Sequence, residues 1–284
     1  MADTNELLRI LQLEPIELDM FRGHTPPEER RRIYGGQVVA QALTAAYRTI
    51  EGRVCSSMHA YFIRPGDPKI PILYVVERDR DGRSFSVRRV VAIQNGAQIF
   101  NLAATFQTPE EGLEHQLEMP DLPGPDGLLN EEQLRARPDA AQPLFVDGRP
   151  IEVRPIDPRP RGDRTPHPAR LNVWFRARQS LGDDIAVNQC ALAYASDMTL
   201  MDASLHPHPV DWESGELQAA SLDHALWFHR HSDFAQWHLF VQDSPSASGG
   251  RGFNRGSIFN QQGVLIASAA QEALIRVRSR AGEG

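Results

Sequence analysis

The chain has 284 residues and a formal net charge of −7, with 30 Lys and Arg residues against 37 Asp and Glu residues. A chain of this length can bury one large core or two ordinary ones without disulfide or metal support. The acidic balance argues against a nucleic-acid or anionic-membrane binder, because such proteins depend on clustered positive charge. We therefore expect a small-molecule substrate or a protein partner.

The two cysteines and the first residues indicate the compartment. Cys55 and Cys190 form no CxxC motif, so neither a disulfide framework nor a structural zinc site is indicated. The N-terminus is acidic where a signal peptide would be basic, and no apolar run is long enough to span a bilayer. We predict a cytoplasmic protein without membrane insertion.

Two helices are expected in the first part of the chain. Residues 6–11 have amphipathic spacing after Asp3, which is typical of a peripheral helix with an N-cap. Residues 38–46 are apolar or small on every side, as expected of a helix that is fully buried. A sheet must then wrap around this second helix.

The remaining segments recur in pairs, in the same order and with slowly drifting spacing. The matched pairs are 34–37 (YGGQ) with 194–197 (YASD), 56–62 (SSMHAYF) with 221–227 (SLDHALW), 73–76 (LYVV) with 239–242 (LFVQ), and 88–104 with 255–271. The last pair predicts two hairpins, with turns at Asn95-Gly96 and Gln262-Gly263. The first pair places Gln37 and Asp197 in equivalent positions at the start of a helix.

A Pro-rich and charged segment separates the two copies. We expect an N-terminal repeat at 1–107, a linker at 108–168 and a C-terminal repeat at 169–284. Each repeat reads as one helix followed by antiparallel strands, so the fold class is α+β.

Four segments carry a resemblance to a known family. They are YGGQVVAQA at 34–42, FIRPG at 62–66, LDHALWFHR at 222–230, and the stretch from Arg251-Gly252-Phe253 to Gln271-Glu272. In this order and spacing the chain resembles the acyl-CoA thioesterase II family. The resemblance implies a double hotdog, in which two tandem repeats each wrap a long antiparallel sheet around a buried helix.

The resemblance also implies a catalytic site in the second repeat. In that family an Asp, a Thr or Ser, and a Gln hold the hydrolytic water, and the matching residues here are Asp197, Ser221 and Gln271. Thioester hydrolysis needs a base for the water proton, groups that orient the water and donors for the oxyanion. Asp197 is the only base of the three, and Ser221 and Gln271 can both donate and accept hydrogen bonds.

Substrate contacts are expected at three further positions. Backbone N–H groups at Gly36-Gln37 and at Ser196-Asp197 are candidate oxyanion donors, since a helix start carries partial positive charge. Arg251 follows the loop 244–250, which either binds a phosphate of coenzyme A or is a plain hairpin loop.

Competing interpretations of single residues remain open at this stage. Asp197 could be an ordinary helix cap. A Ser221–His224–Asp223 triad is disfavoured, because Ser221 and His224 would point to opposite faces of a strand. The histidine pairs 206/208 and 229/231 lack the spacing of a known metal motif, so no metal is expected. Several residues could line an acyl pocket or simply fill the core: Met58, Tyr61, Phe62, Trp227 and Phe228.

These observations lead to the prediction of an acyl-CoA hydrolase that needs no cofactor beyond the coenzyme A of its substrate. Hotdog folds commonly pair further, so we expect a homodimer or higher homo-oligomer. The alternatives are a non-catalytic acyl-CoA binding protein and a hotdog enoyl-CoA hydratase, whose DxNPxH motif is absent from the sequence.

Overall fold

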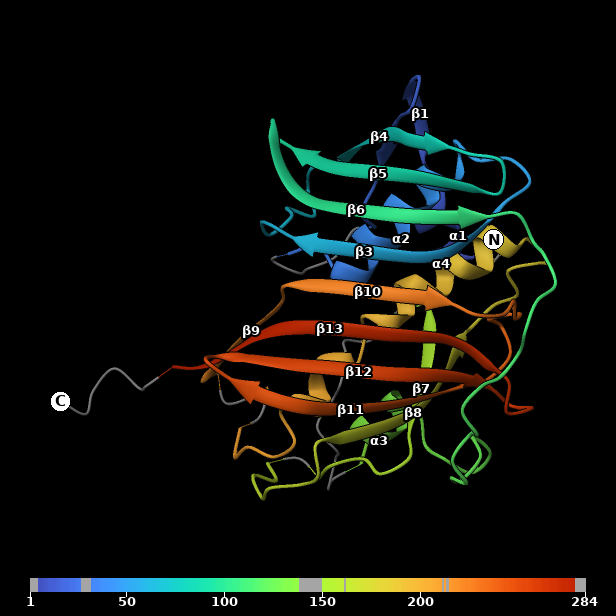
Figure 1. Ribbon diagram of the computed structural model, residues 1–284. Coiled ribbons are helices and arrows are strands. Elements are labelled where there is room, and N and C mark those ends of the chain that lie inside the picture. Colours follow the sequence, from blue (N-terminus) through green and yellow to red (C-terminus); the bar gives the residue numbers. More distant parts are fainter. Residues whose placement is uncertain are drawn as a thin grey trace.

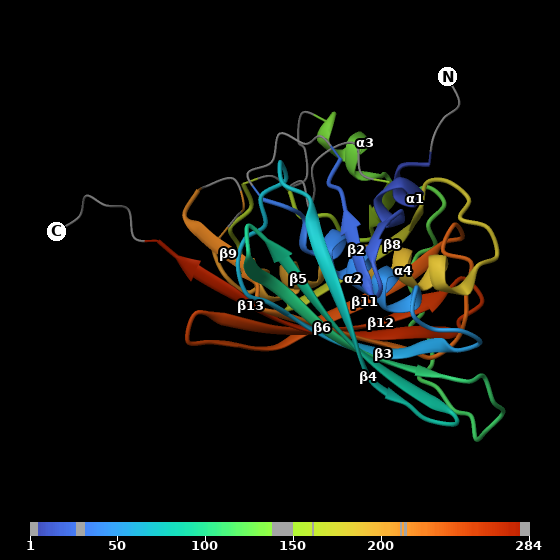
Figure 2. The same ribbon diagram turned by 90° about the horizontal axis from the view of Figure 1, so that it is seen from above.

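The computed structural model describes residues 5–26, 32–137, 150–160, 162–210, 212 and 215–278. One antiparallel sheet runs through the molecule, and the helices lie on one side of it (Figures 1 and 2). The helical elements of the described chain are α1 (Glu6–Leu11), α2 (Gly35–Tyr47), α3 (Glu131–Arg135), α4 (Ile185–Ser196) and the 3₁₀ helix η1 (Leu200–Ser204).

The described strands fall into two matching sets. The first set is β1 (Glu14–Glu17), β2 (Met20–Gly23), β3 (Val54–Phe62), β4 (Ile72–Asp81), β5 (Phe85–Gln94) and β6 (Ala97–Gln107). The second set is β7 (Ile151–Pro155), β8 (Arg170–Ala177), β9 (Leu217–Ser221), β10 (Asp223–Phe228), β11 (His238–Ser248), β12 (Arg251–Asn260) and β13 (Leu265–Val277).

The strand order shows the duplication directly. The sheet runs β1-β2-β4-β5-β6-β3-β10-β13-β12-β11-β8-β7, with β9 paired to β13. If β9 is left out, each half of the chain contributes six strands. Read from the outer edge of the sheet inward, both halves place their strands in the same chain order: first, second, fourth, fifth, sixth and third. The halves join where β3 pairs with β10, with Ala60 opposite His224 and His59 opposite Ala225. The fold is therefore the expected double hotdog.

The two long helices pack side by side under the sheet and run in opposite directions. Tyr34, which caps the start of α2, donates a hydrogen bond from its hydroxyl to the carbonyl of Tyr194 near the end of α4, at 2.8 Å. At the other end the Tyr47 hydroxyl donates to Gln189 Oε1. A side chain on Gly36 would overlap the Tyr194 carbonyl oxygen, so glycine permits this close helix approach.

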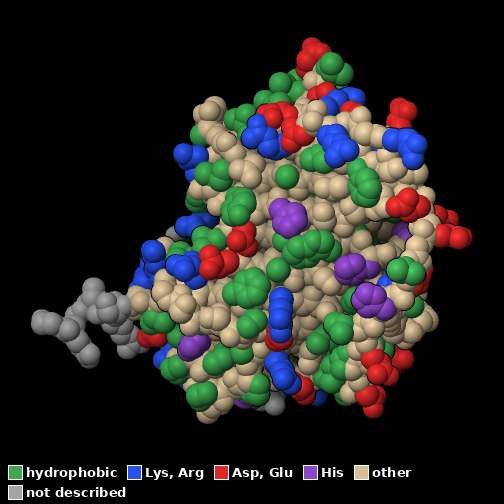
Figure 3. Space-filling view, in the orientation of Figure 1, with side chains coloured by type: hydrophobic (Ala, Val, Ile, Leu, Met, Phe, Trp, Pro, Cys, Tyr) green, Lys and Arg blue, Asp and Glu red, His purple; other side chains and the backbone are tan. Residues whose placement is uncertain are grey.

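The alternation of side chains along the strands separates the core from the outer face. Leu226 and Phe228 point inward and are buried, whereas Trp227 between them is 37% exposed. On the outer face, hydrophobic side chains are interspersed with charged and histidine side chains (Figure 3). Both predicted hairpins are present, and Asn95 and Gly96 have the positive φ angles, 49° and 72°, that their tight turn requires.

In the segment expected to be a linker, 108–168, the described residues include two regular elements, α3 and β7. β7 pairs with β8 at the outer edge of the sheet, with Ile151 opposite Ala177. The chain therefore re-enters the sheet at Ile151, before the expected end of the linker. The short strand has a Pro and charged residues, which is why its composition resembles that of a linker.

Candidate active site

The fold brings together the three residues expected to act in catalysis. Asp197 follows the last residue of α4, Ser221 ends β9, and Gln271 lies on the inward face of β13. The Ser221 hydroxyl donates to Asp197 Oδ1 at 3.1 Å, and the Gln271 side-chain amide donates to the same oxygen at 2.6 Å. Two donors on one oxygen fix the orientation of the carboxylate.

Gln271 also supplies a buried acceptor. The side chain is 1% exposed, and its Oε1 has no hydrogen-bond partner within the described chain. A buried amide oxygen is costly unless a donor reaches it, and water is the usual donor at such positions. Gln271 can therefore hold Asp197 with its N–H group and a water molecule with its oxygen.

The first half of the chain contributes the start of α2. A Cβ atom on Gly35 would lie 2.7 Å from Asp197 Oδ2, so this oxygen faces the first turn of α2. The N–H groups of a first helical turn lack the usual helical acceptor and carry partial positive charge, although that of Gln37 donates to the Tyr34 carbonyl at 3.1 Å. This turn includes Gly36, so the first expected group of oxyanion donors lies beside the expected base.

The second expected group of oxyanion donors is not at a helix start. Ser196 is the last residue of α4 and Asp197 is its C-cap, so the expectation of a helix beginning at Asp197 is wrong. The C-terminal end of a helix presents carbonyl groups and partial negative charge, which cannot stabilise an oxyanion. Asp197 is not an N-terminal helix cap for the same reason.

The pairing of Gln37 with Asp197 as equivalent residues is also wrong. α2 corresponds to α4, so the C-cap of α2, Arg48, corresponds to Asp197. The sequence similarity between 34–37 and 194–197 joins two segments that lie against each other, since Tyr34 and Tyr194 have ring centroids 5.0 Å apart.

The Gln37 and Arg251 side chains have hydrogen-bond or ion-pair partners elsewhere. The Gln37 side chain is buried and donates to Thr25 Oγ1 at 3.0 Å, which ties α2 to the segment after β2. Arg251 forms an exposed ion pair with Glu272 at 2.9 Å, and Glu272 faces the opposite side of β13 from Gln271. The segment before Arg251 belongs to the β11–β12 hairpin, with a turn at 249–250.

His224 packs beside the candidate site, against the residue that precedes Asp197. It is fully buried, its Nε2 lies 2.8 Å from Ser196 Oγ, and burial lowers its pKa to about 4. A neutral imidazole therefore packs against the residue that precedes Asp197. His224 thus contacts Ser196, whereas Ser221, which ends the separate strand β9, donates to Asp197.

Of the five candidate acyl-pocket residues, Phe62 can be placed near Asp197, because both side chains lie against Gly35. A Cβ on Gly35 would lie 3.0 Å from the ring of Phe62, which ends β3. Tyr61 and Trp227 are exposed on the outer face, whereas Met58 and Phe228 are buried in the core.

Sequence reasoning missed two residues of this region. Gly35 was not singled out from its neighbours, although its place at the predicted helix start was visible. Asn254 lies opposite Gln271 in the β12–β13 ladder, is fully buried and has an unpartnered Oδ1 within the described chain. A polar residue alternating with outward-facing Phe253 and Arg255 was the available signal for an inward side chain.

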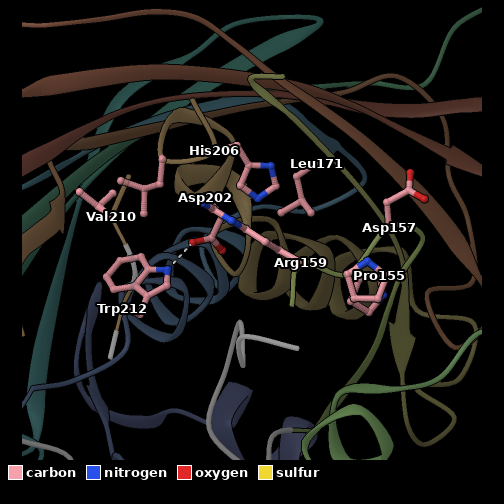
Figure 4. Close-up of a pocket in the computed structure, with 10 residues that line it drawn as sticks. Pro155, Asp157, Arg159, Leu171, Asp202, His206, Val210 and Trp212 are labelled. Atoms are coloured by element: carbon pink, nitrogen blue, oxygen red, sulfur yellow. Dashed lines mark hydrogen bonds between the residues drawn. The ribbon is translucent and has the colours of Figure 1, made fainter. Parts of the chain in front are cut away.

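A second buried acid lies a short distance along the chain. Asp202 on η1 accepts a hydrogen bond from Trp212 Nε1 at 2.7 Å, and the two side chains point toward each other in a small cavity (Figure 4). Burial raises the pKa of Asp202 to about 7. The cavity volume is about 30 Å³, enough for a water molecule but not for a substrate.

Metal and membrane features can be stated for the described residues. Among them, no three His, Cys, Asp or Glu side chains gather in a way that could hold a metal ion. Likewise, no helix in the described part of the chain is long and apolar enough to cross a membrane.

Comparison with known proteins shows the family of this chain. Residues 25–107 match the family described as acyl-CoA thioesterase N-terminal domain, and residues 140–274 match the family described as acyl-CoA thioesterase. Acyl-CoA thioesterase 2 of Haemophilus influenzae is 41% identical over 96% of this chain and 97% of its own length. Human acyl-coenzyme A thioesterase 8 is 38% identical over 96% and 90%, respectively.

Solved structures show the same relationship. The acyl-CoA thioesterase II TesB2 from Mycobacterium marinum has a TM-score of 0.80 and 40% identity, over 96% of this chain and 99% of that one. A hotdog protein from Alicyclobacillus acidocaldarius shares the fold with a TM-score of 0.74 at 20% identity, over 96% and 98%. The chain belongs to the acyl-CoA thioesterase family.

Proposed function

We propose that this protein hydrolyses fatty acyl-CoA to free fatty acid and coenzyme A at Asp197, Ser221 and Gln271. The observation that carries the proposal is the pair of hydrogen bonds from Ser221 and Gln271 to a single oxygen of Asp197. This arrangement orients a base beside a hydroxyl and an amide that can both contact the same water molecule.

The reaction then follows from the roles of these groups. Asp197 takes a proton from the water while the water oxygen bonds to the thioester carbonyl carbon. The first-turn N–H groups of α2 stabilise the negative charge that develops on the carbonyl oxygen. The carbon–sulfur bond breaks, and the coenzyme A sulfur leaves and takes up a proton, so one water yields one carboxylic acid and one thiol.

Protein side chains and backbone supply every group that this scheme uses, so we propose a cofactor-independent enzyme. The assignments of Gly36, Gln37 and Arg251 to substrate binding remain predictions, as do the homodimer and the cytoplasmic location. Of these three residues, Gly36 has the strongest support, because it follows Gly35, the residue that approaches Asp197, in the first turn of α2. The Gln37 N–H, by contrast, already donates to the Tyr34 carbonyl.

The test is release of free thiol from acyl-CoA substrates of increasing chain length. We expect Asp197→Asn to lower turnover by about 10²–10⁴-fold, the usual contribution of a general base. Asp183→Asn removes an exposed carboxylate just before α4 and should leave turnover unchanged. Thermal unfolding of both variants would show whether they remain folded, and a fully active Asp197→Asn protein would refute the role of Asp197.

The same assay separates the alternatives. A binding protein would retain acyl-CoA without releasing thiol. An enoyl-CoA hydratase would remove the enoyl absorbance of its substrate, again without thiol release. Adding a metal chelator to the wild-type assay tests the prediction that no metal is needed.

A further inference from the structure

The double hotdog contains a second place related to the catalytic site by its internal symmetry. At the catalytic site the end of α4 meets the start of α2; at the related place the end of α2 meets the start of α4. Asp197 at the C-cap of α4 corresponds to Arg48 at the C-cap of α2. Gln271 corresponds to Ala104, since Gln271 lies opposite Asn254 and Ala104 lies opposite Arg88 in the matching hairpins.

The related place therefore lacks the groups needed for hydrolysis. An arginine stands where the base would be, and a methyl group stands where the water-binding amide would be. Arg88, which corresponds to Asn254, is buried and bound to Thr49 Oγ1 and Asp81, at 2.8 and 2.7 Å.

A cavity of about 710 Å³ nevertheless occupies this place. This volume lies in the range that binds small organic ligands. α1 closes one side of the cavity, the facing ends of α2 and α4 form another, and the start of β3 completes the wall. The larger aliphatic side chains of the lining are Leu8, Leu11, Ile50, Val54, Ile185 and Val187.

The charges of the lining select the kind of ligand. Arg9, Arg48 and Arg53 line the cavity, against a single acid, Asp184. Asp184 accepts from the backbone N–H groups of Ala186 and Val187 and so serves as the N-cap of α4.

The arginines differ in their partners. Arg53 donates to the carbonyl of Gly82 at 2.6 Å and lies 4.0 Å from Asp81. Arg9 and Arg48 are exposed, and neither makes an ion pair within the described residues. Two arginines beside an apolar cavity suit a ligand with a long hydrocarbon chain and one anionic end.

We propose that this cavity is a non-hydrolytic binding site for a long-chain carboxylate, with the carboxylate at Arg48 and Arg9 and the hydrocarbon chain between α1 and the ends of α2 and α4. The identity of the ligand rests on the proposed function, because hydrolysis of fatty acyl-CoA releases such a carboxylate. The reaction product would then bind at the symmetry-related place where the catalytic groups are missing.

Photolabelling locates the ligand directly. The probe is palmitate with a diazirine on its hydrocarbon chain, irradiated with the full-length protein and mapped by mass spectrometry. We expect adducts in peptides that contain α1, the end of α2 and the start of α4. Arg48→Glu should weaken labelling of these peptides roughly ten- to hundred-fold, the usual worth of a charge-assisted hydrogen bond.

Two further variants make the test decisive. Val187→Trp fills the cavity without changing its charge and should also abolish these adducts. Arg170→Glu reverses an exposed charge on β8, a strand that contributes no residue to the cavity lining, and should leave them unchanged. Equal labelling in wild type, Arg48→Glu and Val187→Trp, or adducts confined to peptides of the catalytic site, would overturn the proposal.

Thiol release is measured on the same samples. Arg48→Glu should retain wild-type initial rates, since Arg48 is not among the catalytic groups. If the wild-type protein released no thiol, the proposed function would be contradicted, whereas labelling of the cavity would remain a valid result. Intact hydrolysis with no labelling of the cavity would contradict only this inference.

Discussion

A Cβ atom on Gly35 would lie 2.7 Å from Oδ2 of Asp197, so a residue of the first repeat sets the space around the expected base in the second. The ring of Phe62 closes the same space at 3.0 Å. The proposed catalytic site is thus built by both halves of the chain, although all three polar groups come from the second half.

Gly35→Ala should lower kcat by roughly ten- to hundred-fold, since a misplacement of about 1 Å can cost this much. The added methyl group must displace the Asp197 carboxylate or the Phe62 ring. Alanine is the better helix former, so the loss should not arise from unfolding of α2. Steady-state kinetics and thermal unfolding measure the two effects separately.

Gly124→Ala is the matched control, because a methyl group there meets no atom within 4 Å among the described residues. It should leave kcat unchanged. Wild-type kcat in Gly35→Ala would mean that the space between α2 and Asp197 does not matter for the reaction.

Gln271→Glu should move the acid limb of the pH–rate profile to higher pH. The amide nitrogen of Gln271 lies 2.6 Å from Asp197 Oδ1, and a second carboxylate at this distance cannot coexist with the first in the ionised form. One of the two must keep a proton until the pH rises. The profile of kcat/KM between acidic and mildly alkaline pH measures the shift.

Gln271→Leu is the companion variant. It removes the donor without adding a charge, so activity should fall at every pH, and the acid limb should move to higher pH by less than in Gln271→Glu, because only a hydrogen bond to the ionised carboxylate is lost. An unshifted limb in Gln271→Glu would contradict direct contact between the two groups during catalysis.

Ser221→Ala should lower kcat by roughly ten- to hundred-fold, because it removes a donor to Asp197 worth about 1.5–3 kcal/mol. Ser221→Thr keeps the hydroxyl and should stay within a few-fold of wild type. If both variants lost the same activity, the size of the side chain rather than its hydroxyl would be the important property. Thiol release by the three proteins makes this comparison.

Asp202→Asn should stabilise the protein at neutral and alkaline pH. An Asp in an unfolded chain titrates near pH 4, whereas burial raises the pKa of Asp202 to about 7 in the folded protein. Between these values the folded state binds more protons than the unfolded state, so wild-type stability falls as the pH rises through this window. Asn cannot ionise, and it can still accept the hydrogen bond from Trp212.

Urea unfolding at several pH values checks this prediction. The free energy of unfolding of Asp202→Asn should exceed that of wild type by up to roughly 4 kcal/mol above pH 7, a gap that closes toward pH 4. Asp157→Asn, an exposed carboxylate at the same cavity, is the control. A difference that did not change with pH would show that Asp202 does not titrate as described.

Hydrophobic patterns and turn signals predicted a duplicated α+β chain, and the family resemblance supplied the double hotdog. Asn95-Gly96 and Gln262-Gly263 marked the two hairpins, and the small residues around Val38 to Ala46 marked the buried helix. Local sequence patterns did not predict that a helix ends, rather than begins, at Asp197. Nothing near Tyr194 distinguishes the end of a helix from its start, because α4 is apolar on every side and its C-cap residue, Asp197, is also a good N-cap.

The meeting of Ser221 and Gln271 on one oxygen could be inferred only through the family resemblance. The two residues lie on different strands, and β9 reaches β13 by pairing Ser221 with Ala273. Register between distant strands depends on turns and bulges that no local window reveals. The position of Gly35 against Asp197 depends in turn on how closely α2 and α4 pack.

The union of two hotdog units through the β3–β10 ladder also has a genetic consequence. In a symmetric pair of identical subunits, a mutation that alters one helix end alters both, so neither site can change alone. A tandem chain removes this constraint. Asp197 can be retained at one helix end while Arg48 occupies the other, and a single polypeptide can then specialise its two sites for different tasks.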